Sequence, residues 1–422
     1  MGLDPAYWKL QAPGGRLFAD PQPDTDETAF QVDNTSAAYY DSVYYKLHRA
    51  ALQPVPPPRE PQPRVDLTAI LGADFLAPTV AAKKVTFHAV GDTGAAKVNS
   101  RQTAAEAIAN EASVVDAMSW DVRTGGPTGP AFFFHLGDVV YNFGEGQYYY
   151  DQFYEPFQGY DRPIFAIPGN HDGAVFGDDP DTPDIPTLTA FVRNFCAEAP
   201  TRSPDAGSLV RSKMTQPGVY FTLDAPFVSI VGLYTNVLEG PGVISSQGGR
   251  YPIGDEQLDF LTAELVRLAP ERKAGKRAVI IACHHPPASV DSKHGGGSGL
   301  ADDLDTAAKQ AGFWPDAVLS GHAHVYQRYT RKTHDGREIP YVVAGSGGFA
   351  ATAPQGGLPH APLTIGEYTL VAKPLVDFGY LTVTVDLGTP QGHLTITFND
   401  RTNTKAHDTV RLNLKTGKIL KH

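Results

Sequence analysis

Five short polar clusters in this sequence carry side chains that can bind metal ions or transfer protons. Each follows or ends an apolar segment that is typical of a β-strand. We therefore expect each cluster on a loop at the carboxyl end of a strand, the edge where open α/β sheets bind ligands. Taken singly, Gly169-Asn170-His171-Asp172 is more typical of a polar turn, and Asp92 and Asp138 are as typical of helix caps. The clusters are Gly91-Asp92-Thr93-Gly94, Gly137-Asp138-Val139-Val140-Tyr141, Gly169-Asn170-His171-Asp172, His284-His285-Pro286-Pro287 and Gly321-His322-Ala323-His324.

The donor types in these clusters favour a catalytic metal centre. Carboxylate, amide and imidazole groups suit zinc, manganese and iron, whereas structural zinc sites prefer thiolates. Five strand ends supply more donors than one ion needs. A dinuclear centre uses them all, because one carboxylate can bridge two ions roughly 3.5–4 Å apart. Such a pair activates water and holds a phosphoryl oxygen, so we expect hydrolysis of a phosphate ester.

The elements that must position these clusters alternate between strands and helices, which predicts a layered α/β fold. Residues 220–224 and 227–234 are typical of a hairpin, and the alternating pattern of residues 379–413 predicts antiparallel C-terminal strands. We expect helices at residues 101–118, 145–157 and 255–268, the first from apolar residues at helical spacing. The site-bearing strands are expected at residues 84–90, 131–136, 162–168, 278–283 and 317–320, with a further strand at 341–344.

The chain begins with a segment of different composition. Residues 1–80 are rich in Pro, Asp and Tyr, with a proline cluster from Pro54 to Pro63. Because proline favours extended backbone, we interpret residues 1–80 as an N-terminal extension with a Pro-rich linker, after a short helix at residues 36–52. Packing against the main domain and capping of its site are both open for this extension. Residues 81–422 then form the catalytic domain, with its core motifs at residues 84–350.

Charge and composition exclude several partners. The net charge of -11 over 422 residues argues against nucleic-acid and anionic-membrane partners. No segment is long and apolar enough to span a bilayer, and the N-terminus lacks the pattern of a signal peptide. We therefore expect a soluble, cytoplasmic protein, or a periplasmic or secreted one if a leader was removed. The expected partner is a small phosphate ester, and the oligomeric state is open.

The two cysteines, Cys196 and Cys283, are too few for a disulfide framework. Cys283 ends an apolar strand, so we interpret it as a buried reduced thiol rather than a nucleophile beside His284. His88 and His135 lie inside apolar strands, and we interpret them as core histidines or as residues behind the site.

The clusters together resemble a known signature. GDTG, GDVVY, GNHD, H-x-P and GHAH, in this order, are similar to the motifs of calcineurin-like metallophosphoesterases. Tyr141, three residues after Asp138, and the run from His322 to Arg328 resemble the purple acid phosphatase branch, although Gln327 stands where that branch commonly has glutamate. The resemblance covers residues 84–350. It implies a four-layer α/β/β/α sandwich of two mixed sheets, preceded here by the N-terminal extension.

The resemblance also implies a role for each site residue. His171 matches the general acid, and His294 resembles a histidine that contacts the substrate. In H-x-P the first histidine binds metal, which selects His284 rather than His285. The first ion would be held by Asp92, Asp138, Tyr141 and His324, and the second by Asp138, Asn170, His284 and His322. The implied reaction is phosphomonoester hydrolysis by attack of a metal-bound hydroxide.

A charge count favours one Fe(III) with a second ion of Zn, Fe or Mn(II). Two aspartates and one phenolate leave such a pair with net positive charge for phosphate. Many relatives have Asp-x-His in the first motif, but Gly94 occupies the histidine position here, so Tyr141 is the natural replacement. Two alternatives stay open. One is a phosphodiesterase or nucleotide hydrolase of the same fold, and the other is a non-catalytic metal- or phosphate-binding protein.

Overall fold

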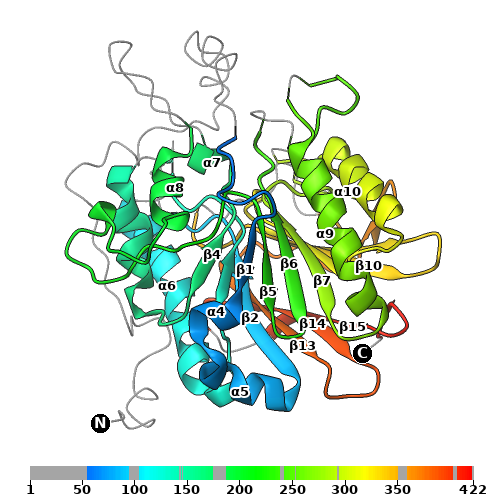
Figure 1. Ribbon diagram of the computed structural model, residues 1–422, viewed down its shortest axis with the longest axis horizontal. Coiled ribbons are helices and arrows are strands. Elements are labelled where there is room, and N and C mark those ends of the chain that lie inside the picture. The colour runs from blue at the N-terminus through cyan, green and yellow to red at the C-terminus, as the bar shows by residue number, and fades with distance from the viewer. Residues whose placement is uncertain are drawn as a thin grey trace.

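Two β-sheets packed face to face form the centre of the molecule (Figure 1). The computed structural model describes residues 55–94, 104–141, 144, 146–173, 187–237, 242–251, 253–291, 294–349, 359–402 and 406–420. The helix expected at residues 36–52 lies outside this range. No helix among the described residues is both long and apolar enough to cross a bilayer.

The smaller sheet has seven strands and carries three of the five polar clusters. Strands β2, β3 and β4 run parallel, so their carboxyl ends lie at one edge of the sheet. The C-terminal strands complete the sheet in antiparallel pairs, as predicted. The strand order is β16 (Lys418–Ile419), β15 (Ala406–Asn413), β14 (His393–Asp400), β13 (Gly379–Asp386), β2 (Lys84–Val90), β3 (Phe133–His135) and β4 (Ile164–Ala166).

The larger sheet has nine strands and carries the two histidine clusters at the ends of β7 and β8. Strands β6, β7, β8 and β10 are mutually parallel, whereas β5 and β6 form the predicted antiparallel hairpin. The order is β1 (Arg64–Asp66), β5 (Phe221–Ala225), β6 (Val228–Leu233), β7 (Ala278–Cys283), β8 (Ala317–Ser320), β10 (Glu338–Ala344), β9 (Tyr326–Lys332), β12 (Tyr368–Leu370) and β11 (Leu363–Ile365).

The core between the sheets is built from side chains that alternate along the strands. Phe87 and Phe134 point into this space, and Phe134 packs against Phe221 of the other sheet with ring centroids 5.9 Å apart. Val90 and Phe133 instead belong to the core beneath the outer helices. Strands covered on both faces are almost continuously apolar, which explains why they could be recognised from the sequence.

Helices cover both outer faces. Helix α6 (Ala104–Thr124) packs on the seven-stranded sheet, while α9 (Glu256–Lys273) and α10 (Ser298–Ala311) lie together on the nine-stranded sheet (Figure 1). Helix α10 is capped at its carboxyl end by Gly312, which adopts a left-handed φ of 67° and donates its N–H to the last turn. The layers therefore confirm the predicted α/β/β/α sandwich. The shorter helices are α4 (Leu67–Leu71), α5 (Ala73–Ala82), α7 (Asn170–Gly173) and α8 (Thr189–Phe195).

Two regions differ from the sequence-based prediction. The single helix expected at residues 145–157 is instead broken into 3₁₀ turns η4 (Gly146–Tyr148) and η6 (Pro156–Gly159) around a π-helical turn η5 (Tyr150–Tyr154). Its aromatic side chains pack in several directions, and Pro156 lacks the N–H that would continue the turn. Within the expected extension, residues 64–66 form β1, which pairs parallel with β5. The division of the chain at residue 80 stays a prediction. Two further 3₁₀ turns are η3 (Gly126–Thr128) and η7 (Pro204–Ala206).

Candidate metal centre

The loops after β2 and β3 bring Asp92 and Asp138 together. The backbone N–H of Asp92 donates to the carbonyl oxygen of Gly137 at 2.9 Å. Both aspartates adopt left-handed backbone, with φ of 58° and 56°. Such conformations cost non-glycine residues about 1–3 kcal/mol each and concentrate at functional sites. Gly137, with φ of 97°, has no room for a side chain, because a Cβ there would lie 2.6 Å from Nδ1 of His284.

The hydroxyl of Tyr141 lies between the two carboxylates. It donates to Oδ2 of Asp138 at 2.9 Å and approaches Oδ1 of Asp92 at 3.2 Å. Its ring stacks on Phe349 at a centroid distance of 3.8 Å and an angle of 3°. Burial, together with the negative charges of the two aspartates, raises the pKa of Tyr141 well above its ordinary value. The phenol is therefore protonated here, and a cation that replaced this proton would join the same three oxygens.

A second set of donors meets at Asn170. Its Oδ1 lies 3.1 Å from Nε2 of His284 and 3.0 Å from Nδ1 of His322. Nε2 of His284 is also 3.3 Å from Oδ2 of Asp138, so Asp138 stands between this set and the first. His324 lies beside the first set, with its Nε2 3.5 Å from Oδ1 of Asp92. The structure thus brings all seven predicted metal-binding residues into one cluster, although their metal binding itself stays a prediction.

The electrostatics of the cluster fit cations. Asp92, Asp138 and His284 are buried, and one donor atom from each lies within 4.8 Å of the others. Burial raises the pKa of Asp92 to about 7, with the charge of Asp138 adding to this effect and that of His284 opposing it. Burial would also raise the pKa of Asp138, but His284 and His171 outweigh it and hold this pKa below its ordinary value. Two adjacent buried carboxylates are costly in their ionised forms unless positive charge lies between them, and divalent or trivalent ions would supply that charge.

Further buried groups brace the loops that carry the donors. The carboxylate of Asp172 accepts the backbone N–H groups of Val139 and Val140, at 3.0 and 3.1 Å, and that of Gly169 at 2.8 Å. It therefore ties the loop after β3 to the loop after β4. His135 accepts the N–H of Gly137 at Nδ1, which leaves Nε2–H to donate to Thr93. His135 is thus a supporting residue behind the site, in agreement with its position in an apolar strand.

The two predicted substrate-facing histidines lie beside the donor cluster. His171 is buried in α7, its backbone N–H donates to Oδ1 of Asp138 at 2.9 Å, and its ring lies 4.2 Å from that of Tyr141. His294 approaches Asp291 through Nδ1 at 3.1 Å. Its ring lies 4.7 Å from that of His322 and 5.0 Å from that of His324. Both imidazoles therefore border the same site, on different sides.

A third imidazole of this kind, His285, was not predicted as a functional residue. Thr235 Oγ1 accepts the backbone N–H of His285 at 3.1 Å and lies 2.9 Å from its Nδ1. The threonine hydroxyl proton is then directed to Nδ1, which places the imidazole proton on Nε2. Burial lowers the pKa of His285 to about 3, so the ring is neutral. Its centroid is 4.3 Å from that of His322, and its hydrogen bonds among the described residues use Nδ1 and the backbone N–H but not Nε2. In the sequence, the position of His285 directly after His284 was the signal that it could be functional. The contact between His285 and Thr235 could not be predicted from the sequence.

The sequence matches a known protein family, and the fold matches solved structures. The sequence model of calcineurin-like phosphoesterases matches residues 85–326, a span that contains all seven donors. The solved purple acid phosphatase PPD1 from yellow lupin (Lupinus luteus) seeds is 16% identical with a TM-score of 0.53, over 78% of this chain and 54% of that one. GAP50, described as the anchor in the inner membrane complex of Plasmodium, is 14% identical with a TM-score of 0.52, over 79% of this chain and 91% of that one.

These structural likenesses show the fold alone, and this chain spans about half the length of the lupin protein. The search of curated proteins finds no match.

Proposed function

We propose that this chain, which belongs to the calcineurin-like phosphoesterase family, hydrolyses phosphomonoesters at a dinuclear metal centre. The observation that carries the proposal is the convergence of seven donors in two sets that share Asp138. One set is the oxygen-rich group around Tyr141, and the other is the histidine-rich group around Asn170. When bound there, two metal ions would polarise a water molecule and the phosphoryl oxygens.

The side chains around the donors supply the remaining functions. His171 is proposed to protonate the leaving oxygen, because its imidazole lies next to the aspartate cluster without belonging to it. His294 and His285 are proposed to hold the phosphoryl group by hydrogen bonds from ring nitrogen atoms. His294 is oriented by Asp291 and His285 by Thr235, so both rings are fixed before a substrate arrives.

The proposed ion pair is one Fe(III) with a second ion of Zn, Fe or Mn(II). The support is Tyr141, whose hydroxyl already contacts both carboxylates and is a hard oxygen donor once ionised. A protein loaded with Fe(III) should then absorb visible light through its phenolate, whereas one loaded with zinc alone should be colourless.

The test replaces Asp138 and Asn170, separately, by alanine. We expect each variant to lose turnover of 4-nitrophenyl phosphate and at least one metal ion per chain, measured by elemental analysis. Asp302→Ala is the matched control, because this aspartate is exposed on α10 and is not one of the proposed donors. Full turnover by the Asp138→Ala protein would refute the assignment.

Two further measurements separate this function from its alternatives. Faster turnover of bis(4-nitrophenyl) phosphate than of the monoester would identify a phosphodiesterase. A wild-type protein with two bound ions and no turnover of either ester would identify a non-catalytic metal-binding protein. This second measurement is necessary because GAP50, a protein of similar fold, is described as an anchor.

A further inference from the structure

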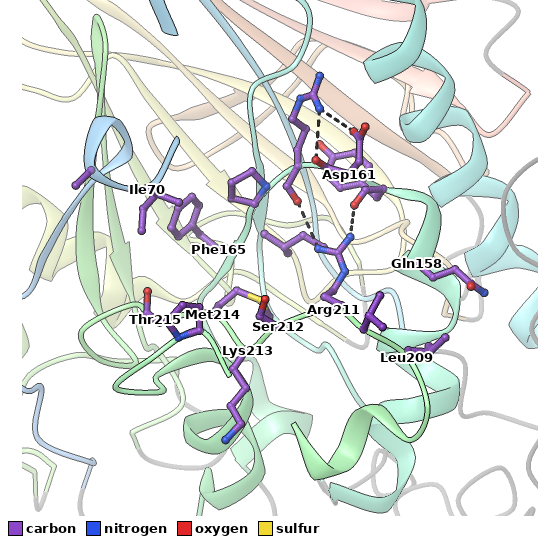
Figure 2. A pocket seen from close by; sticks show the side chains of 17 residues that line it. Ile70, Gln158, Asp161, Phe165, Leu209, Arg211, Ser212, Lys213, Met214 and Thr215 are labelled. Carbon is purple, nitrogen blue, oxygen red and sulfur yellow. Dashed lines mark hydrogen bonds and ion pairs between the residues drawn. The ribbon is translucent and has the colours of Figure 1, made fainter. Parts of the chain in front are cut away.

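A cavity of about 650 Å³ lies at the amino end of β4, the outermost strand of the seven-stranded sheet. Helix α4 forms one side, residues 209–215 form the other, and residues 162–165 form the floor (Figure 2). Asn170, in contrast, follows the carboxyl end of β4. The cavity and the candidate metal centre are therefore at opposite ends of this strand and share no residue. Its volume falls within the range of small-molecule sites, about 300–1,000 Å³.

The walls of this cavity are preformed. Residues 209–215 are held by backbone hydrogen bonds from Lys213 to Thr201 at 2.8 Å and from Met214 to Asn194 at 3.0 Å. Leu209 and Met214 also pack against the hydrophobic core. A ligand would thus find the pocket already open, without the cost of ordering a loop.

The lining combines apolar side chains with an excess of positive charge. Arg162, Arg211 and Lys213 line the cavity, against a single carboxylate, Asp161, which is bonded to Arg162 at 2.8 Å. The apolar part of the lining includes Ile70, Phe165, Leu209 and Met214. Such a combination recognises a ligand with a negative end and an apolar body.

Arg211 contributes a positive charge that no carboxylate of the described residues pairs with. Its guanidinium donates only to backbone oxygens, those of Phe157, Tyr160 and Arg162, and it forms no ion pair among the described residues. Its Nε is buried without a hydrogen-bond partner in the part of the chain that the structure describes, and the same is true of Arg162. Carbonyl oxygens orient a guanidinium but carry no full negative charge, so an anion in the cavity would complete the site.

Exposed apolar residues surround the same cavity. Val210 is 90% exposed and Ile70 45% exposed, and both line it. Phe75, 42% exposed, lies under the guanidinium of Arg162. A group of large apolar side chains left in water is uncommon unless it serves binding.

We propose that this cavity binds a small amphiphilic carboxylate, with its anionic group at Arg211 and Arg162 and its apolar chain against Ile70, Leu209 and Met214. The site is separate from the metal centre, and its existence does not depend on the phosphatase activity proposed above.

The test uses decanoate and the metal-loaded protein, with calorimetry in the presence of excess inorganic phosphate to block the metal centre. We expect one decanoate per chain. Leu209→Glu places a carboxylate in the apolar wall, and Arg211→Gln removes the charge; each should weaken binding about tenfold or more. Leu209 is half-buried at the edge of the core, so its variant should fold even if Arg211→Gln disturbs the loop that Arg211 supports.

Val266→Glu is the matched control, because Val266 is 52% exposed on α9 and does not line the cavity; it should bind decanoate as the wild type does. The uncharged analogue 1-decanol should bind more weakly than decanoate. Three results would each overturn the proposal: no decanoate binding by the wild type, binding of 1-decanol as strong as that of decanoate, or unchanged decanoate binding by the Leu209→Glu protein.

Discussion

Replacement of His285 by alanine tests the contribution of the third imidazole at the metal centre. The structure predicts a neutral ring whose Nδ1 is occupied by Thr235 and whose Nε2–H is available to the substrate. A hydrogen bond to a charged group contributes about 1.5–3 kcal/mol, which corresponds to a loss of roughly 10- to 150-fold in kcat/KM. The loss should fall on kcat/KM for a phosphomonoester without any loss of metal, because His285 is not among the seven donors.

The assay combines turnover of 4-nitrophenyl phosphate, elemental analysis and calorimetry with inorganic phosphate. We expect the His285→Ala protein to keep its metal and to bind phosphate more weakly by a similar factor. Thr235→Val keeps the imidazole but removes the hydroxyl that fixes its tautomer, so kcat/KM should fall by a smaller factor of about five. Thr235→Ser keeps a hydroxyl, so its kcat/KM should be close to that of the wild type. His334→Ala is the control, because His334 is exposed and distant from the site in the fold.

Two outcomes would refute this reasoning. Unchanged phosphate binding by the His285→Ala protein would show that the ring does not reach the substrate. Loss of a metal ion in the same protein would show that His285 is a ligand or holds one in place. Phosphate binding without turnover in the wild type would instead count against the proposed activity and leave the role of His285 intact.

Three further perturbations test other parts of the structure. With Fe(III) bound, Tyr141→Phe should lose the visible phenolate band, and a retained band would assign it to another residue. Phe134→Ala should lower the free energy of unfolding by about 3–5 kcal/mol in urea titrations, since Phe134 is fully buried between the sheets; a loss below about 1 kcal/mol would contradict this packing. Burial would raise the pKa of Glu264, but hydrogen bonds from Arg64 and Arg267 outweigh it and hold this pKa below its ordinary value. Its ionised form therefore stabilises the fold at neutral pH and loses this effect as pH falls through the lowered pKa, so Glu264→Gln should cost about 1–3 kcal/mol near pH 7 and much less near pH 3. An equal cost at both pH values would be inconsistent with this linkage.

The strands that carry the site could be predicted because the residue pattern within each strand is sufficient to identify it. β7 is covered on both faces and is a short continuous apolar segment, whereas β2 alternates apolar residues with Thr86 and His88; each strand is followed by polar residues at the sheet edge. Family resemblance then allowed Asp92, Asp138 and His284 to be grouped before their distances were known. The structure confirms the fold and brings the predicted donors together.

Other features depend on contacts between distant parts of the chain and were not predictable. Phe349 stacks on Tyr141, and Thr235 fixes His285, although nothing in either pair's local sequence indicates the contact. The left-handed backbone of His322, with φ of 69°, is likewise imposed by its surroundings. Its N–H donates to Oδ2 of Asp92 at 2.8 Å, and this bond exists only after the two sheets have packed. The broken helix around η5 follows the same rule, because its irregular turns are set by the packing of its aromatic rings.

The pairing of β13 with β2 has a consequence for biosynthesis. Leu381 lies opposite Ala89, so the strand that leads to Asp92 borders a segment that is synthesised much later. During translation every proposed metal donor leaves the ribosome before this neighbour exists. Until then one side of β2 offers unpaired N–H and C=O groups, the kind of edge on which nascent chains associate. We therefore expect metal uptake to follow release of the finished polypeptide, and chains halted before residue 379 to aggregate rather than to assemble a partial centre.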